Sequence, residues 1–242
     1  MFTRTESFRD FIRYYPSVSF IVFIHLLLYL FTVLPFLPNF WFIETLSGVN
    51  VYIAEGEYWR LITPIFMHSG FTHMLFNSFS LILFAPPLEK WLGSFKFFLI
   101  YLLCGFLANV GTYIFEPLSY THVGSSGAIF GIFGFYAALI VFKKNFISVD
   151  NSKVILILLA ISLVMTFLQP NINIAAHLSG LAAGFLIGSL GHFNRNALTR
   201  SASEVARWAS SKRRDVSGQS PLKLLVWGAI ILFALLGIFI QK

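Results

Sequence analysis

Residues 124–142 read Gly-Ser-Ser-Gly-Ala-Ile-Phe-Gly-Ile-Phe-Gly-Phe-Tyr-Ala-Ala-Leu-Ile-Val-Phe, an apolar run that opens with two serines between glycines and ends before Lys143. From residue 126 the run is 17 residues long, close to the ~20 that a helix needs to cross a bilayer. A second apolar run, at residues 174–192, carries His177 in its first turn. Strongly polar side chains in such segments are candidate functional residues.

The composition indicates a membrane protein, because 57% of the 242 residues are hydrophobic and 11% are charged. Ordinary soluble domains have about 45–50% and about 25%. The apolar runs lack the alternation of barrel strands, and helices satisfy their own backbone groups in lipid. We therefore predict an all-α polytopic membrane protein whose seven spans lie near residues 18–36, 66–86, 95–115, 126–142, 153–169, 174–192 and 222–240.

The basic residues predict the orientation of these spans. Fifteen of the 17 Lys and Arg residues precede the first span or lie in the connections after the second, fourth and sixth, whereas Arg60 and Lys242 lie on the other side. The positive-inside rule then places the N-terminus in the cytoplasm and the C-terminus outside. The net charge of +7 fits this topology and contact with anionic lipid. Nucleic acid is excluded as a partner, because its binding needs basic residues interleaved with aromatic residues on one face.

Three polar residues are expected at the same depth in the membrane. Counted from the charged residue at the inner end of its own span, Ser126 is 17 residues away, His73 is 16 and His177 is 18. At 1.5 Å per residue these separations are about 24–27 Å, in a hydrocarbon core of ~30 Å. All three side chains should therefore lie a few ångströms below the outer surface.

The glycines on two spans could bring Ser126 into contact with His177. Small residues at intervals of three or four occur on both: Gly127, Gly131, Gly134, Gly180, Gly184 and Gly188. Such residues let membrane helices approach closely, and a serine in contact with a histidine forms a nucleophile with its general base. The alternative is that the glycines only pack helices and the polar groups only form interhelical hydrogen bonds.

His73 and Asn77 are four residues apart and therefore share one helical face. Two donors on one face beside a nucleophile could form an oxyanion hole, together with the backbone N–H of Ser126 at a helix N-terminus. Taken alone, a His-x-x-x-Asn pair is more often structural than catalytic.

In combination, these motifs resemble those of the rhomboid family of intramembrane serine proteases. The matching residues are Gly124 to Gly127 for Gly-x-Ser-Gly, His73 and Asn77 for His-x-x-x-Asn, Ala176, His177, Gly180 and Gly184 for Ala-His-x-x-Gly-x-x-x-Gly, Trp59-Arg60, His68, and residues 89–94. The resemblance covers roughly residues 18–192 in the family's order and implies a six-helix catalytic core there. Residues 1–17 would be a basic cytoplasmic segment forming a surface helix, residues 193–221 a basic cytoplasmic linker, and residues 222–242 an added seventh helix.

The resemblance also implies the role of each site residue. Ser126 would attack the scissile carbonyl and His177 would move its proton, while His73, Asn77 and the N–H of Ser126 would hold the oxyanion. The sequence has no Asp or Glu between Glu116 and Asp150 or between Asp150 and Glu204, so His177 should be held by packing. Phe130 would stack on it where many relatives have Tyr. The residues expected to support this dyad are Gly124, Gly127, Phe130, Gly180 and Gly184.

Other polar residues have competing interpretations. Ser125 is a second candidate nucleophile, although the motif favours Ser126. His25 could form a hydrogen bond to a neighbouring helix or serve as a proton relay. His122 could contact substrate or be a solvated loop residue.

The second span and the loop before it carry further signals. Trp59 and Arg60 are expected to anchor the first outer loop at the membrane interface. His68 should support that loop or a water route to the site. Pro86-Pro87 predicts a kink in the helix or its end.

The resemblance implies single-pass membrane proteins as substrates, cut near the outer end of their spans without a cofactor, and membrane lipids as further partners. A catalytically inactive rhomboid-like protein that only binds membrane helices is the main alternative. A metalloprotease with His68, His73 and His177 as ligands lacks the His-Glu-x-x-His motif. A transporter would need midplane charges or paired broken helices, which are not evident. The oligomeric state is not indicated.

Overall fold

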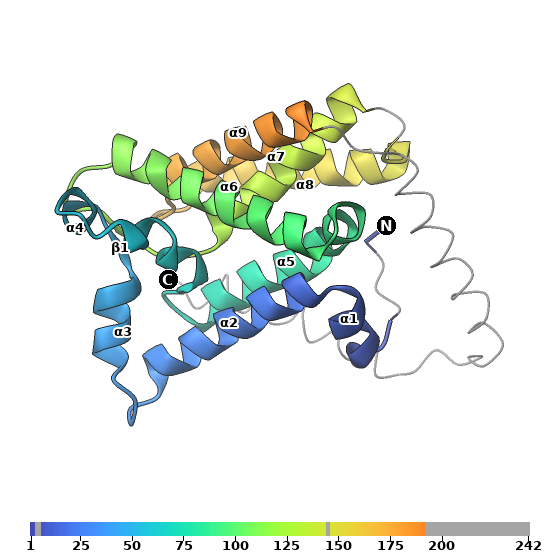
Figure 1. Cartoon of the computed structure of the whole chain (residues 1–242). Helices are drawn as coiled ribbons and strands as arrows, with labels where there is room; N and C mark the ends of the chain where they lie inside the picture. Colours follow the sequence, from blue (N-terminus) through green and yellow to red (C-terminus); the bar gives the residue numbers. More distant parts are fainter. Residues whose placement is uncertain (3–5, 144–145, 192–242) are drawn as a thin grey trace. The chain divides into compact units, whose positions relative to one another are not determined.

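The computed structural model describes residues 1–2, 6–143 and 146–191. Within them, six long helices form a bundle (Figure 1): α2 (Pro16–Val33), α5 (Phe71–Leu92), α6 (Ser94–Phe115), α7 (Ser126–Phe142), α8 (Val149–Leu168) and α9 (Ile174–Leu190). The predicted span at residues 222–240 lies outside the described residues.

Four of these helices, α2, α5, α6 and α8, are long and apolar enough to cross a membrane within the part of the chain that is described. The other two, α7 and α9, are apolar helices of 17 residues each, or about 25 Å at 1.5 Å per residue. The chain is therefore a multi-pass membrane protein, and its long elements in the described residues are all helices, as its composition predicted.

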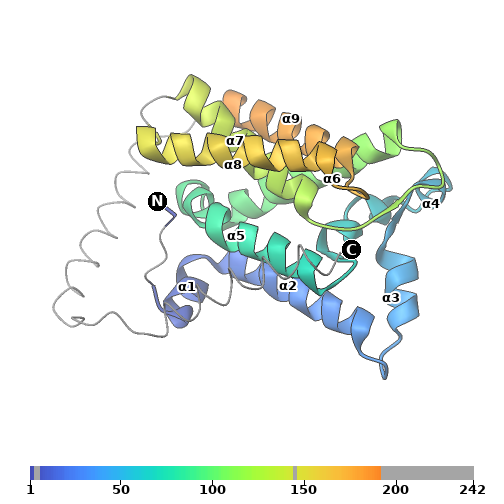
Figure 2. The same ribbon diagram turned by 180° about the vertical axis from the view of Figure 1, so that it is seen from behind.

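Helix α7 is the central element of the bundle, because 12 of its 17 residues are buried. It packs against α9 most extensively and also against α6, as Figure 1 shows, while α8 lies on the face that Figure 2 brings forward. Its observed ends match the predicted span of residues 126–142, because the apolar run is bounded by Ser125 and Lys143.

Helix α5 differs from its predicted span of residues 66–86. It begins at Phe71 and continues past Pro86 and Pro87 to Leu92. The prolines therefore do not end the helix, and the alternative, a kink at this point, stays a prediction. Proline removes a backbone donor inside a helix, but neighbouring helices can compensate in membrane proteins. The hydroxyl of Tyr136 on α7 donates to the carbonyl of Phe84, 2.7 Å away, in the turn before the prolines. The carbonyls that lose their helical donor to Pro86 and Pro87 are those of Ile82 and Leu83, so this bond ties α5 to α7 and does not replace a lost one.

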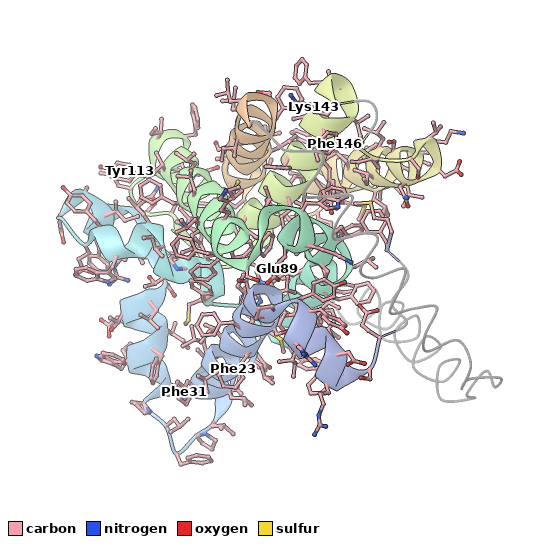
Figure 3. The ribbon with its side chains drawn as sticks, turned by 45° about the vertical axis from the view of Figure 1, so that its right-hand side comes forward. Phe23, Phe31, Glu89, Tyr113, Lys143 and Phe146 are labelled. Carbon is pink, nitrogen blue, oxygen red and sulfur yellow. The ribbon has the colours of Figure 1, made fainter. Side chains whose placement is uncertain are left out.

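The last turn of α5 is joined to the first turn of α2 by a buried carboxylate. Glu89 is 1% exposed, and its two oxygens accept hydrogen bonds from the backbone N–H groups of Ser17 and Val18 at 2.8 and 2.9 Å. Figure 3 shows Glu89 where the end of α5 meets the start of α2. First-turn N–H groups lack partners inside their own helix, and their dipole favours a negative charge. Glu89 thus fixes where α2 begins.

Replacing Glu89 with alanine should lower the free energy of unfolding by about 2–4 kcal/mol, because two charge-assisted hydrogen bonds are lost and two amides are left without acceptors. Thermal unfolding in detergent would measure this loss. Glu55→Ala, at an exposed position just after α4 (Asn50–Ala54), is the matched control and should leave the unfolding temperature unchanged. Equal unfolding temperatures for the two variants would contradict the role of Glu89.

Short elements surround one end of the bundle. They are α3 (Asn39–Leu46), β1 (Gly48–Val49), α4, the 3₁₀ helices η1 (Tyr58–Leu61) and η2 (Thr63–Phe66), and β2 (Thr121–His122). β1 and β2 pair antiparallel, with Gly48 opposite His122. The helix expected within residues 1–17 is α1 (Phe8–Tyr14), capped by the side chain of Ser7; its place on a lipid leaflet stays a prediction.

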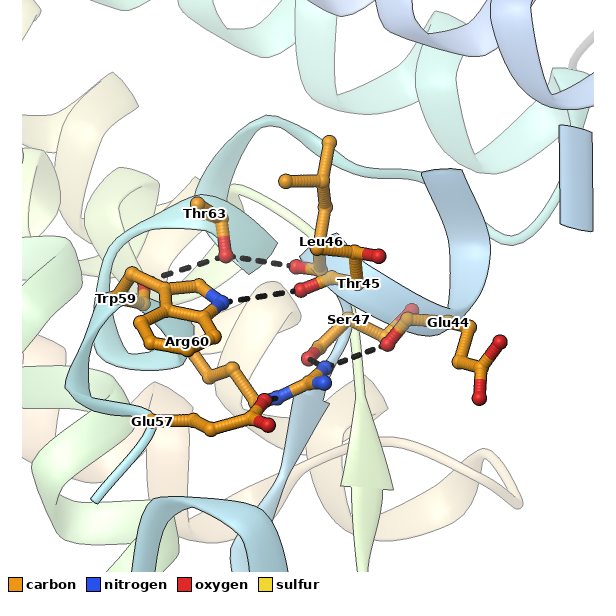
Figure 4. Close-up of polar contacts among 8 residues, drawn as sticks. All are labelled: Glu44, Thr45, Leu46, Ser47, Glu57, Trp59, Arg60 and Thr63. Carbon is orange, nitrogen blue, oxygen red and sulfur yellow. Dashed lines mark hydrogen bonds and ion pairs between the residues drawn. The ribbon is translucent and has the colours of Figure 1, made fainter. Parts of the chain in front are cut away.

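Arg60 holds this loop region together from the inside. It is 4% exposed, and its Nη1 donates to the carbonyls of Glu44 and Ser47 at 2.6 and 2.7 Å, while its Nε pairs with Glu57 (Figure 4). The indole of Trp59 donates to the carbonyl of Thr45. Trp59 and Arg60 therefore hold the loop through hydrogen bonds within the protein. The predicted anchoring of this loop at the membrane interface stays a prediction.

Candidate active site

Ser126 and His177 come together where α7 and α9 begin. The hydroxyl oxygen of Ser126 lies 2.8 Å from Nε2 of His177. Ser126 is the first residue of α7, and His177 lies in the first turn of α9, whose start is capped by Asn173. The contact that equal depth suggested is thus present in the structure.

Glycines on the two helices make this approach possible. A Cβ atom on Gly180 would overlap the carbonyl oxygen of Gly127, and one on Gly184 would overlap that of Gly131. A Cβ atom on Gly134 would likewise overlap the carbonyl oxygen of Leu181. Because only hydrogen fits at these positions, the backbones of α7 and α9 lie against each other, which brings their first turns into contact.

A hydroxyl on α8 contacts the other nitrogen of His177. Thr166 Oγ1 lies 2.8 Å from Nδ1 of His177 and donates to the carbonyl of Ser162, also at 2.8 Å. Because the threonine hydroxyl donates its one proton to that carbonyl, the hydroxyl oxygen of Thr166 accepts a hydrogen bond from His177. The imidazole then carries its proton on Nδ1 and turns the lone pair of Nε2 toward the hydroxyl of Ser126.

The structure therefore corrects the expectation that packing alone holds His177. Packing does contribute, because the Phe130 ring stacks on the imidazole with centroids 4.1 Å apart and an angle of 18° between the planes. Thr166 adds a directional contact that a phenyl ring cannot supply. Thr166 was not among the predicted site residues, although a hydroxyl in the apolar span of residues 153–169 is a signal of the kind that identified Ser126.

His73 and Asn77 lie beside the turn that leads into Ser126. Gly124 has a φ of +126°, and a Cβ there would come within 2.8 Å of Nε2 of His73 and 3.8 Å of Nδ2 of Asn77. The hydroxyl of Ser69 lies 3.0 Å from Nδ1 of His73. Bound to Ser69 through Nδ1, His73 directs Nε2 toward the Gly124 turn, so the structure brings both expected oxyanion donors to the start of α7.

Ser125 is placed differently from Ser126. It is fully buried, and its hydroxyl faces the phenol of Tyr101 on α6 without reaching hydrogen-bond geometry. Its backbone precedes α7 as the N-cap residue. Of these two neighbouring serines, Ser126 is the one whose hydroxyl contacts His177.

His122 is not the solvated loop residue that one interpretation expected. It is 9% exposed, lies against Gly48 of the paired strand and stacks on Tyr120. Burial lowers the pKa of His122 from 6.5 to about 4. Contact between His122 and substrate stays untested.

Acidification should destabilise the loop region that contains His122. Because the folded-state pKa is about 4 and the unfolded value is about 6.5, the stabilising contribution of the neutral ring is complete above pH 6.5 and declines as the pH falls toward 4. Thermal unfolding at a series of pH values would show this slope, and His122→Phe should reduce it. An identical slope in the variant would contradict the assignment.

Comparison with known proteins identifies the class of this site. A hydrogen-bonded serine and histidine within a bundle of apolar helices is typical of a membrane-embedded serine hydrolase. The Rhomboid domain family matches residues 55–193. The chain therefore belongs to the rhomboid family of proteases.

Individual relatives support the same family assignment. "Putative rhomboid protease YdcA" of Bacillus subtilis (strain 168) is 50% identical over 190 residues, which cover 78% of this chain and 96% of that protein. Rhomboid protease GluP of the same organism is 39% identical over 138 residues, 56% of this chain and 26% of GluP. RHOMBOID-like protein 1 of Arabidopsis thaliana is 33% identical over 158 residues, 61% of this chain and 40% of that protein.

Proposed function

We propose that this chain is an intramembrane serine endopeptidase that cuts membrane proteins in or near the outer end of their transmembrane segments. The observation that carries this proposal is the 2.8 Å contact between Ser126 Oγ and His177 Nε2. The imidazole tautomer set by Thr166 leaves that nitrogen free to take the serine proton. A protein that only bound helices would not need this arrangement.

The reaction would proceed through an acyl-enzyme. Ser126 Oγ attacks the scissile carbonyl carbon as its proton passes to Nε2 of His177, and the resulting oxyanion accepts hydrogen bonds from His73, Asn77 and the Ser126 N–H. His177 then returns the proton to the leaving amine, and the peptide C–N bond breaks. Water attacks the acyl carbon as His177 takes one of its protons. His177 then returns that proton to Oγ as the bond between Oγ and the acyl carbon breaks, which releases the carboxylic acid and regenerates Ser126.

The proposed orientation places this site near the outer surface. The Lys and Arg distribution puts the N-terminus in the cytoplasm, in keeping with the positive-inside rule. A transmembrane helix hides its carbonyls in internal hydrogen bonds, so a substrate must unwind before attack. We infer that substrates are single-pass proteins with Gly, Pro or polar residues near the outer end of their span, and a small residue before the cut.

The test is cleavage of a reporter single-pass protein of this kind in proteoliposomes. The expected result is an ectodomain fragment released outside, formed equally in the presence of a strong chelator. Loss of cleavage on chelation would support the metalloprotease alternative. Among the described residues, no three His, Cys, Asp or Glu side chains are arranged to hold a metal ion.

Replacing Thr166 with valine should slow cleavage about tenfold, as expected when one hydrogen bond that stabilises the reactive tautomer is lost. Thr166→Ser keeps the hydroxyl and should recover most of the rate. Cleavage rates across a pH series would be compared with unfolding temperatures. Equal losses in the valine and serine variants would show that Thr166 acts through packing and does not orient His177.

A further inference from the structure

Thr112 lies where α6 packs against the start of α9. Its side chain is fully buried, three residues before the end of α6. Its hydroxyl donates to the carbonyl of Ala108 in its own helix, 3.2 Å away, so the hydroxyl oxygen remains an acceptor. A Cβ atom on the neighbouring Gly111 would overlap the side chain of Ser179 on α9. The two helices are therefore in close contact at this point.

Asn173 joins this hydroxyl to the first turn of α9. Its Nδ2 donates to Thr112 Oγ1 at 2.8 Å. Its Oδ1 accepts a hydrogen bond from the backbone N–H of Ala176 at 2.9 Å, and its backbone carbonyl accepts one from the N–H of His177 at 3.2 Å. One residue thus caps α9 with its oxygens and holds that helix against α6 with its nitrogen.

A second asparagine holds the end of α6. Asn50 is the first residue of α4 and is 0% exposed. Its Nδ2 donates to the carbonyls of Glu116 and Pro117 at 3.2 and 3.0 Å. Carbonyls at the C-terminal end of a helix lack partners inside it, so this amide satisfies them and ties the first outer loop to α6. The part of α6 that carries Thr112 is thus itself held in place.

The position of His177 depends on a helix end. His177 lies in the first turn of α9, and the ends of helices fray. The glycine contacts set how closely α7 and α9 approach, whereas a hydrogen bond has a preferred distance and angle. The bond between Asn173 and Thr112 can therefore fix the height and rotation of this turn. Small errors matter, because a displacement of about 1 Å in an active site can cost about 100-fold in rate.

We propose that Thr112 is a positioning residue for the dyad. By holding the side chain of Asn173 it fixes the first turn of α9, and thereby the 2.8 Å approach of His177 Nε2 to Ser126 Oγ. This role rests on the proposed protease function, because the step that it serves is transfer of the serine proton to His177. Thr112 acts through Asn173 and takes no part in bond making.

Fluorophosphonate labelling of Thr112→Val, in the full chain in lipid nanodiscs, tests this role. Valine keeps the branched shape and removes the acceptor oxygen. The rate constant for labelling Ser126 and the kcat of reporter cleavage should both fall about tenfold, the effect of one hydrogen bond of ordinary strength. The final extent of labelling and KM should not change, because the change lies between helices and leaves the protein folded.

Two further variants separate position from stability. Thr112→Ser keeps the hydroxyl and loses a buried methyl group, so it should recover most of the labelling rate although its unfolding temperature falls. Thr32→Val removes a hydroxyl that donates to the carbonyl of Tyr29 within α2, and it should be labelled as fast as the unmodified chain. The labelling rate should thus follow the oxygen on residue 112 and not the stability of the bundle.

A double-mutant cycle tests whether Thr112 acts through Asn173. Asn173→Ser keeps a side-chain oxygen that can cap the helix but has no amide to donate to Thr112. Alone, it should slow labelling about as much as Thr112→Val does. Adding Thr112→Val should slow labelling no further, because both changes remove the same bond.

Three results would overturn the proposal. An unchanged labelling rate constant in Thr112→Val would show that the bond does not affect the dyad. A lower extent of labelling at an unchanged rate constant would make Thr112 a stability residue only. Effects that multiply in the double variant would mean that Thr112 and Asn173 act separately. Failure of the proposed function gives a different result, because the fluorophosphonate would then leave Ser126 unlabelled in the unmodified chain.

Discussion

Replacing Ser126 with alanine is expected to lower cleavage by about 10⁴-fold or more, because a nucleophile and its base act as one unit and loss of either leaves only binding and the oxyanion donors. His177→Ala should have an effect of the same size. The double variant should be no slower than either single variant. Initial rates of reporter cleavage in proteoliposomes measure all three.

Ser125→Ala is the matched control for this prediction, because it removes the neighbouring hydroxyl, which faces Tyr101. Its cleavage rate should stay close to that of the unmodified chain. A Ser126→Ala variant that still cut the reporter, or a Ser125→Ala variant that did not, would contradict the assignment of the nucleophile.

Gly184→Ala should destabilise the protein by about 3 kcal/mol, the upper end of the usual cost of overpacking a close contact. The added Cβ would overlap the carbonyl of Gly131, so α9 must move away from α7. Displacement of His177 by about 1 Å from Ser126 should reduce cleavage about 100-fold. Unfolding temperature and cleavage rate should therefore fall together.

Gly70→Ala is the control for the same chemical change. Gly70 has an extended backbone, with a φ of −179°, and a Cβ there would meet nothing within 4 Å. This variant should match the unmodified chain in both measurements. If Gly184→Ala also matched it, the close approach of α7 and α9 would not be what sets the geometry of the dyad.

Simple physical regularities predicted much of this fold. The apolar run between Ser125 and Lys143 predicted both ends of α7, because the thickness of the bilayer sets the length of a spanning helix. Residue counts from the charged ends placed Ser126 and His177 at one level, and their hydrogen bond follows from that together with the glycine stripes. Six of the seven predicted spans correspond to helices in the described residues.

The errors arose where tertiary contacts decide the structure. The predicted second span begins at residue 66, but Met67 is buried in the loop before α5 and is not part of the helix. The elements α3, α4, η1 and η2 were not predicted. They are short, and α3 is joined to η1 by hydrogen bonds from Arg60 to carbonyls 13 and 16 residues away, which no local pattern reveals.

The site was predicted less completely than the fold. Motif spacing identified the residues that meet at Ser126, but the orienting contacts come from side chains that no motif includes, Thr166 on α8 and Ser69 before α5. Both are single hydroxyls whose significance depends on which imidazole they contact. The packing of α8 against α9 shows the first partner, and the fold of the chain at the start of α5 shows the second.

Mass-spectrometric mapping of a fluorophosphonate adduct on the full chain in lipid nanodiscs tests the central claim most directly. The Ser126–His177 dyad predicts one covalent adduct, on Ser126, that forms in the unmodified chain and in Ser125→Ala but not in His177→Ala. An adduct on Ser125, or labelling of Ser126 that is equally fast without His177, would contradict the account.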